Sequence, residues 1–141
     1  MRFSKIGLII VVVLAVLSGL FLYFIPQRTT PNGDKSNLII VAEPRAGALI
    51  TSPLTISGSA RGYWYFEASF PIRLLDGNGK LLAIKPAQAQ DEWMTEEFVP
   101  FSLILEFEKP ETQTGTLILE KDNPSGLPEH ADELAIPIRF Q

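Results

Sequence analysis

Hydrophobic and polar residues follow two different patterns along the chain, and the change occurs near residue 26. Residues 6–25 (IGLIIVVVLAVLSGLFLYFI) form an unbroken run of 20 residues without a charge. A helix of that length, rising about 1.5 Å per residue, spans the roughly 30 Å hydrocarbon core of a bilayer. Beyond it, apolar residues recur mostly at every second position, the period of a half-buried β-strand. We therefore expect one transmembrane helix followed by an all-β domain.

The flanks of the apolar run predict its orientation. Arg2 and Lys5 precede it within residues 1–5, whereas Arg28 is the only nearby charge after it. By the positive-inside rule, residues 1–5 are cytoplasmic and the remainder lies outside the cytoplasm, on a single-pass protein of the cell membrane. A cleaved signal peptide is the alternative. We favour a retained signal anchor, because signal sequences have apolar runs of about 7–15 residues and end in a small-residue cleavage site.

The part of the chain after the run divides into a linker and one domain. Residues 26–37 (PQRTTPNGDKSN) are polar and contain two prolines and a glycine, which is the composition of a linker. Residues 38–141 are 104 residues long, an ordinary size for one β-sandwich.

Seven segments of the domain carry a strand signal. Residues 66–74, 101–107 and 134–140 alternate most clearly, and the others are residues 38–42, 54–59, 80–84 and 116–121. Residues 88–97 form at most a short helical turn. The segments predict an immunoglobulin-like antiparallel β-sandwich of about seven strands, preceded by one transmembrane helix. Asp76-Gly77-Asn78-Gly79 predicts a hairpin turn, and Pro71 and Pro137 are expected on edge strands or at bulges.

Composition and charge restrict the chemistry. The chain has no Cys and one His, which excludes thiol nucleophiles, disulfides and thiolate metal sites. All 16 acidic residues but only nine of the 12 basic residues lie beyond residue 28, so this part carries a formal charge of −7. That charge argues against nucleic acid and anionic lipid headgroups as partners, because clustered Lys and Arg hold both.

Six short segments of the domain resemble one known family. In order, they are Pro44 with Gly47, Ser52–Gly58 (SPLTISG), Phe66–Phe70 (FEASF), Leu74–Asp76 with Gly79, Trp93–Thr95, and Asn123–Glu129 (NPSGLPE). Together they resemble the bacterial spore-germination immunoglobulin-like domain family (Gmad type), and we expect it here as a stand-alone domain behind an N-terminal membrane anchor. The resemblance implies a bacterial immunoglobulin-like sandwich, often found beside a germination-type or cell-envelope domain, and it implies no catalytic residues.

Aromatic residues provide the candidate ligand or partner surface: Tyr63, Trp64, Tyr65 and Trp93. In a strand, alternation would turn Trp64 inward and Tyr63 and Tyr65 outward. Exposed aromatic rings can stack on a sugar or anchor a protein partner. The alternative, which we favour, is that Trp64 and Trp93 plug one end of the sandwich.

Three polar segments are candidates for catalytic or metal sites. Asp91, Glu92, Glu96 and Glu97 could supply a glycosidase pair, but a solvated acidic loop is favoured because no cleft is predictable. His130 near Ser125 lacks a nucleophile-elbow motif, and His130, Asp132 and Glu133 match no metal-ligand pattern. Asp76-Gly77-Asn78-Gly79 lacks the distal ligands of a calcium loop. We therefore expect no catalytic, cofactor-binding or metal-binding residues.

The expected function is a non-enzymatic binding or structural module outside the cell membrane, which it contacts through the N-terminal helix. Two partner classes stay open. Peptidoglycan would stack on Tyr63, Tyr65 and either Trp64 or Trp93, whereas an envelope protein would use a sheet edge or an apolar patch. A hydrolase is third, since it would require His130 or a carboxylate pair in a pocket.

Overall fold

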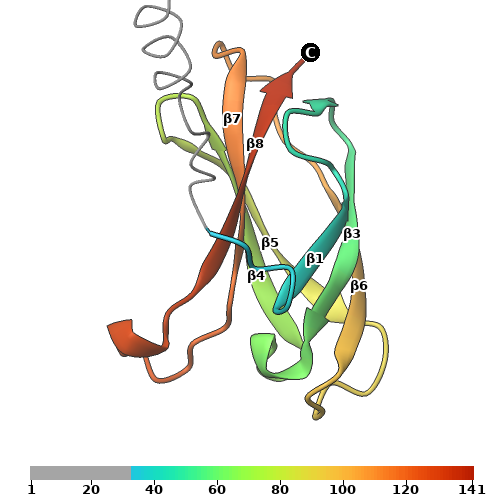
Figure 1. The fold of residues 1–141 in the computed structure, drawn as a ribbon. Coiled ribbons are helices and arrows are strands. Elements are labelled where there is room, and N and C mark those ends of the chain that lie inside the picture. The colour runs from blue at the N-terminus through green and yellow to red at the C-terminus, as the bar shows by residue number, and fades with distance from the viewer. Residues whose placement is uncertain (1–32) are drawn as a thin grey trace, which may run out of the picture. The chain divides into compact units, whose positions relative to one another are not determined.

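The computed structural model describes residues 33–141, which form eight β-strands and two 3-10 helices (Figure 1). The elements in chain order are β1 (Ile39–Glu43), β2 (Leu49–Ile50), β3 (Leu54–Arg61), η1 (Gly62–Trp64), β4 (Ser69–Asp76), β5 (Leu81–Ala89), β6 (Phe98–Leu105), β7 (Thr114–Glu120), η2 (Pro128–His130) and β8 (Glu133–Phe140).

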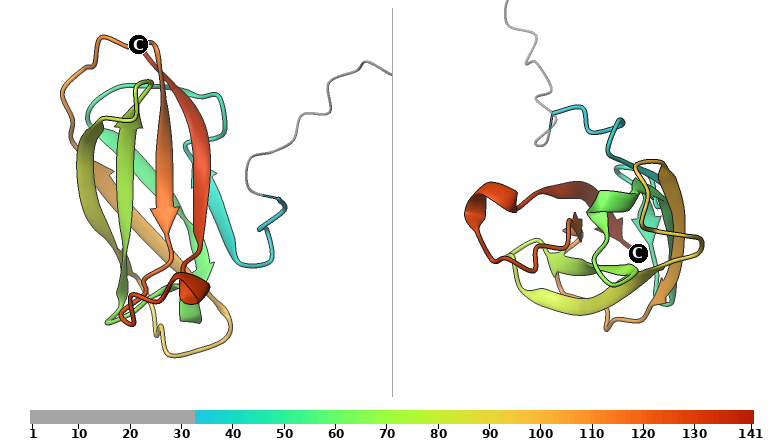
Figure 2. Two further views of the ribbon diagram at one scale, coloured as in Figure 1. Left: turned by 90° about the vertical axis from the view of Figure 1, so that its left-hand side faces the viewer. Right: turned by 90° about the horizontal axis from the view of Figure 1, so that it is seen from below.

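The strands form two facing layers. Their order is β1-β3-β6-β5-β4-β7-β8-β2, but β5 and β6 pair only at Gln88 with Ser102 and at Ala89 with Phe101. The sheet folds over at this short junction, so β1-β3-β6 faces β5-β4-β7-β8-β2 (Figures 1 and 2). All pairs are antiparallel except that of β2 with β8. This is the two-layer arrangement of an immunoglobulin-like sandwich, so the all-β prediction is confirmed.

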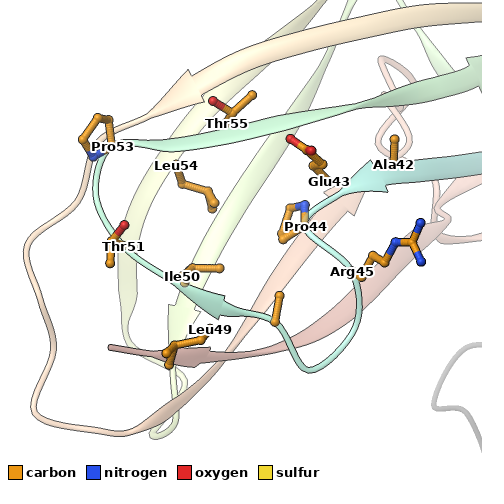
Figure 3. A pocket seen from close by; sticks show the side chains of 11 residues that line it. Ala42, Glu43, Pro44, Arg45, Leu49, Ile50, Thr51, Pro53, Leu54 and Thr55 are labelled. Carbon is orange, nitrogen blue, oxygen red and sulfur yellow. The ribbon is translucent and has the colours of Figure 1, made fainter.

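The predicted fold class is corrected in two other respects. The domain has eight strands instead of about seven. The additional strand, β2, was not predicted because its two residues are too few to show alternation in the sequence. β2 comes after the segment in which the chain crosses from one layer to the other (Figure 3). Within residues 33–141 no helix is long and apolar enough to span a membrane, so the described fold does not contain the predicted transmembrane helix. Residues 6–25, on which that prediction was made, lie outside the described residues.

Strand boundaries also differ from the predictions. β4 begins at Ser69 instead of residue 66, because Glu67 and Ala68 have positive φ angles of 49° and 63° and form a turn. Pro71 lies on an inner strand, contrary to the prediction. β7 pairs with β4 only from Ile72 onward, so the β4–β7 pairing does not require a backbone N–H at Pro71. Pro137 precedes the residues of β8 that pair with β2, so it lies on an edge of the sheet, as predicted.

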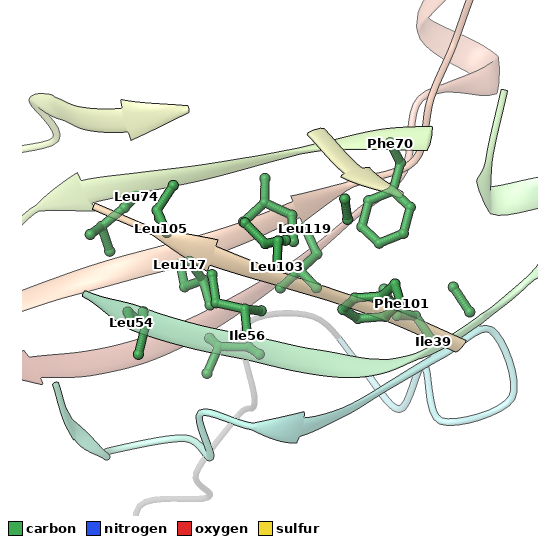
Figure 4. Close-up of a cluster of buried hydrophobic side chains, with 14 of the residues drawn as sticks. Ile39, Leu54, Ile56, Phe70, Leu74, Phe101, Leu103, Leu105, Leu117 and Leu119 are labelled. Atoms are coloured by element: carbon green, nitrogen blue, oxygen red, sulfur yellow. The ribbon is translucent and has the colours of Figure 1, made fainter. Parts of the chain in front are cut away.

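The core fills the space between the layers. Alternate residues of facing strands are buried, among them Phe70, Ile72 and Leu74 of β4 and Phe101 and Leu105 of β6 (Figure 4). No buried residue in the described part of the chain is polar or charged. Because the chain has no Cys, no disulfide links the two layers, and beyond the short β5–β6 junction apolar packing is the main contact between them.

Three aromatic side chains contact one another in a row across the core. The ring centroids of Tyr65 and Phe70 are 5.0 Å apart, and those of Phe70 and Phe101 are also 5.0 Å apart, both in edge-to-face geometry. The buried Tyr65 hydroxyl donates a hydrogen bond of 2.7 Å to the Val99 carbonyl of β6. Tyr65 therefore connects the end of η1 to both layers.

Core and surface leucines should differ sharply in their effect on stability. Leu117 of β7 is 0% exposed and Leu81 of β5 is 48% exposed. Leu117→Ala should lower the free energy of unfolding of the full chain by about 2–5 kcal/mol, through lost burial and the cavity left behind. Leu81→Ala, the control, should cost less than about 1 kcal/mol. Urea denaturation measures both values, and equal losses would contradict the described core.

The Tyr65 hydroxyl should contribute to stability in a pH-dependent way. Burial raises its pKa, so the folded state retains the proton more tightly than the unfolded state, in which tyrosine titrates near pH 10. The contribution is therefore present below about pH 10 and is lost as the pH rises further. Tyr65→Phe should cost about 1–2 kcal/mol at neutral pH and show a shallower loss of stability above about pH 10.

Denaturation at a series of pH values tests this expectation. Tyr63→Phe, which removes the hydroxyl of an exposed tyrosine in η1, is the control and should have the same stability at each pH as the unchanged chain. If Tyr65→Phe has the same alkaline slope as the unchanged chain, the role assigned to the buried hydroxyl is wrong.

Candidate functional site

Three loops meet at one end of the sandwich, and we call them the loop end. They are residues 62–68 after β3, residues 90–97 after β5 and residues 121–132 after β7. The views in Figures 1 and 2 place them together, and the view from below shows η1 between the other two. In immunoglobulin variable domains the loops of one such end form the binding surface.

Backbone contacts of η1 tie the three loops to one another. The Gly62 amide donates to the Glu97 carbonyl at 3.0 Å, and the Asp122 amide donates to the Trp64 carbonyl at 3.0 Å. A Cβ atom on Gly62 would lie only 1.9 Å from the Thr95 carbonyl oxygen and 2.3 Å from that of Trp93. Residues 90–97 thus pack directly on a position where only glycine fits.

The four predicted surface residues do not form one exposed patch. Tyr63 is exposed, but Trp64 is fully buried, Tyr65 is only 3% exposed, and Trp93 is half-buried against the core. Strand alternation fails here because Gly62–Trp64 is a 3-10 helix. The expectation that Tyr65 faces outward is therefore wrong, and Trp64 and Trp93 lie as the plug alternative predicted.

Other apolar side chains join Tyr63 on the surface of the loop end. Nine large hydrophobic side chains are exposed in residues 33–141, and four of them belong to these loops: Tyr63, Phe66, Met94 and Leu127. Their exposed fractions range from 41% to 74%. The other five lie on β1, β2, β5 and β6. The three loops, about a quarter of the described residues, therefore hold four of the nine exposed large hydrophobic side chains.

Sequence reasoning missed three of these residues. Phe66 begins the predicted strand of residues 66–74, but in the structure it precedes the strand and starts a tight turn to Ser69. The amides of Phe66 and Ser69 each donate to the other residue's carbonyl. Met94 and Leu127 were not singled out as surface contacts. Both are isolated apolar residues within polar, turn-forming runs, and that signal could have identified them.

Negative charge is concentrated at the same end. The three loops hold eight acidic residues and one lysine, a formal charge of −7, whereas the rest of residues 33–141 has eight acidic and eight basic residues. The eight acidic residues are Glu67, Asp91, Glu92, Glu96, Glu97, Asp122, Glu129 and Asp132. Partial burial raises the pKa of the Asp122 carboxyl, and the nearby charges of Glu120 and Glu67 raise it further.

The polar clusters considered for catalysis are arranged as ordinary loop structure. Asp91 accepts a hydrogen bond from the Glu92 amide and Glu92 accepts one from the Met94 amide, so both carboxylates shape their own exposed loop. The Ser125 hydroxyl donates to the Asn123 side chain, and the Lys121 ammonium donates to the His130 carbonyl.

The remaining acidic candidates follow the same pattern. Asp132 pairs with Lys35, and Asp76 accepts from the amides of Asn78 and Lys80 in the predicted hairpin turn. No group of three metal-ligating side chains occurs within residues 33–141.

A pocket of about 520 Å³ lies away from the loop end, between β1, β2 and the start of β3 (Figure 3). Its titratable lining residues are Glu43 and Arg45, and the others are small, apolar or hydroxyl side chains. The pocket has volume but no collection of chemically reactive groups.

Comparison with known proteins identifies the domain. The family model Gmad2, described as the immunoglobulin-like domain of bacterial spore germination, matches residues 38–126. No curated protein and no solved structure matches the chain. The matched residues cover β1 to the middle of the loop after β7, which is more than half of the chain and includes most of the sandwich. The chain therefore belongs to the family of immunoglobulin-like domains of bacterial spore germination.

Proposed function

We propose that the domain is a non-catalytic binding module that holds a protein partner at its loop end. The observation that carries this proposal is the presence of four exposed apolar side chains on three loops that η1 ties together. Exposed aromatic and methionine side chains are typical anchors of protein interfaces. Loops that are already ordered lose little conformational entropy on binding.

Peptidoglycan is the second candidate ligand and has less support. Sugar stacking requires accessible aromatic faces, but Trp64 and Tyr65 are buried and Trp93 is half-buried. Tyr63 and Phe66 are the exposed aromatic residues of the loop end, and Met94 and Leu127 suit contact with a protein better than stacking. Because the family is that of immunoglobulin-like domains of bacterial spore germination, the proposed partner is a bacterial protein.

Site-specific photo-crosslinking in bacterial cells tests the location and class of the partner. The full chain would carry benzoylphenylalanine in place of Tyr63 or Met94, with Ile84 of β5, whose exposure lies between theirs, as the control. Tyr63 and Met94 should give the same discrete protein adduct, and Ile84 should not. Phe66→Ser combined with Leu127→Ser should lower the yield about fivefold, because apolar contact area is lost. An adduct with peptidoglycan, or identical adducts from all three positions, would contradict the proposal.

A second test asks whether the arrangement of the loops matters for binding. In Gly62→Ala the new methyl group must displace the Thr95 and Trp93 carbonyls, which should cost about 1–3 kcal/mol of stability. It should also lower crosslinking from Met94 severalfold, although no exposed side chain changes. Gly77→Ala is the control at the opposite end, where the nearest atom, the Thr114 carbonyl oxygen, is 3.0 Å away. Equal crosslinking in both variants would show that the tie through η1 is irrelevant to binding.

A further inference from the structure

The acidic residues of the loop end are mostly free of ionic partners. Three ion pairs occur within residues 33–141, and only that of Lys35 with Asp132 includes an acidic residue of these loops. Arg61, which directly precedes the first of these loops, places its guanidinium 4.1 Å from the centre of the Phe98 ring and donates to the Asn37 and Glu96 carbonyls. The negative charge of the loop end is therefore largely uncompensated within residues 33–141.

The same loops carry the exposed apolar side chains. Met94, the most exposed of them, lies between the acidic pairs Asp91-Glu92 and Glu96-Glu97. Phe66 is followed directly by Glu67, and Leu127 is close in sequence to Glu129. Exposed apolar side chains with carboxylates close to them in sequence are complementary to a segment that carries both apolar side chains and cations.

We infer that the partner segment is cationic as well as apolar, presenting Lys or Arg side chains beside apolar ones; this rests on the proposed function of the loop end. Charge complementarity selects this occupant. A second copy of the chain would bring another charge of −7 against the first, so the loop ends of two copies repel each other. Nucleic acid and anionic lipid are repelled for the same reason.

The inference is tested with the purified full chain and three fluorescent 12-residue peptides, in which leucine alternates with lysine, glutamine or glutamate. Fluorescence anisotropy gives the affinity at 50 mM and 500 mM NaCl. The lysine peptide should bind about tenfold more tightly than the glutamine peptide at low salt, and the glutamate peptide should not bind. The preference should shrink severalfold at high salt, because screening weakens attraction between exposed charges.

Two variants with the same change in net charge localise the effect. Asp91→Asn, Glu92→Gln, Glu96→Gln and Glu97→Gln together remove four negative charges from the loop end. Glu43→Gln, Glu106→Gln, Glu108→Gln and Glu111→Gln, all at exposed positions, remove four from elsewhere. The first set should weaken binding of the lysine peptide about fivefold or more, and the second less than about twofold.

The outcomes separate this inference from the function on which it rests. If all three peptides bind with equal affinity and Met94→Ser abolishes that binding, the cationic preference is overturned. Binding at the loop end would still be supported by that result. Equal weakening by the two charge sets would show unspecific attraction and overturn the inference. Failure of Met94→Ser to alter any binding would count against the loop end itself.

Discussion

Apolar contact between the two layers of the sandwich is the interaction on which the rest of this domain depends, because no disulfide links the layers. The edge-to-face chain from Tyr65 through Phe70 to Phe101 joins η1, β4 and β6, with its centroids 5.0 Å apart at each step. This row of rings keeps Tyr65 in the core next to the buried Trp64, and so fixes η1 across one end of the core.

The position of η1 then determines the character of the loop end. With its amide and carbonyl groups bonded to the loops that follow β5 and β7, η1 leaves Tyr63 on the outside while Trp64 points inward. Elsewhere the surface balances its charges, as on the face where Arg73 lies between Glu120 and Glu133. The loops have no such balance. The domain therefore combines a neutral, closed scaffold with one acidic and partly apolar end.

Much of the fold could be predicted from the sequence, because a strand signal, clearest as period-two alternation in three segments, marked all seven of the longer strands. β2 was missed since two residues cannot show a period, and the described fold contains no counterpart of the predicted transmembrane helix. The site was predicted less well. The run from Tyr63 to Phe66 has strand-like composition, but the close approach of residues 90–97 to Gly62 is a tertiary contact that no local pattern reveals. With a 3-10 helix at Gly62–Trp64 and a turn at Glu67 and Ala68 in place of a strand, Tyr65 is buried and Phe66 is exposed.

The central claim is that the loop end is a preformed surface built on the core, and amide hydrogen exchange in the full chain tests it most directly. The amides of Gly62 and Asp122 bond the carbonyls of Glu97 and Trp64, whereas the Gly126 amide closes only a local turn to Asn123. If the loops are ordered with the core, Gly62 and Asp122 should be protected nearly as well as β-strand amides and far better than Gly126. Exchange of Gly62 and Asp122 as fast as that of Gly126 would contradict a preformed loop end.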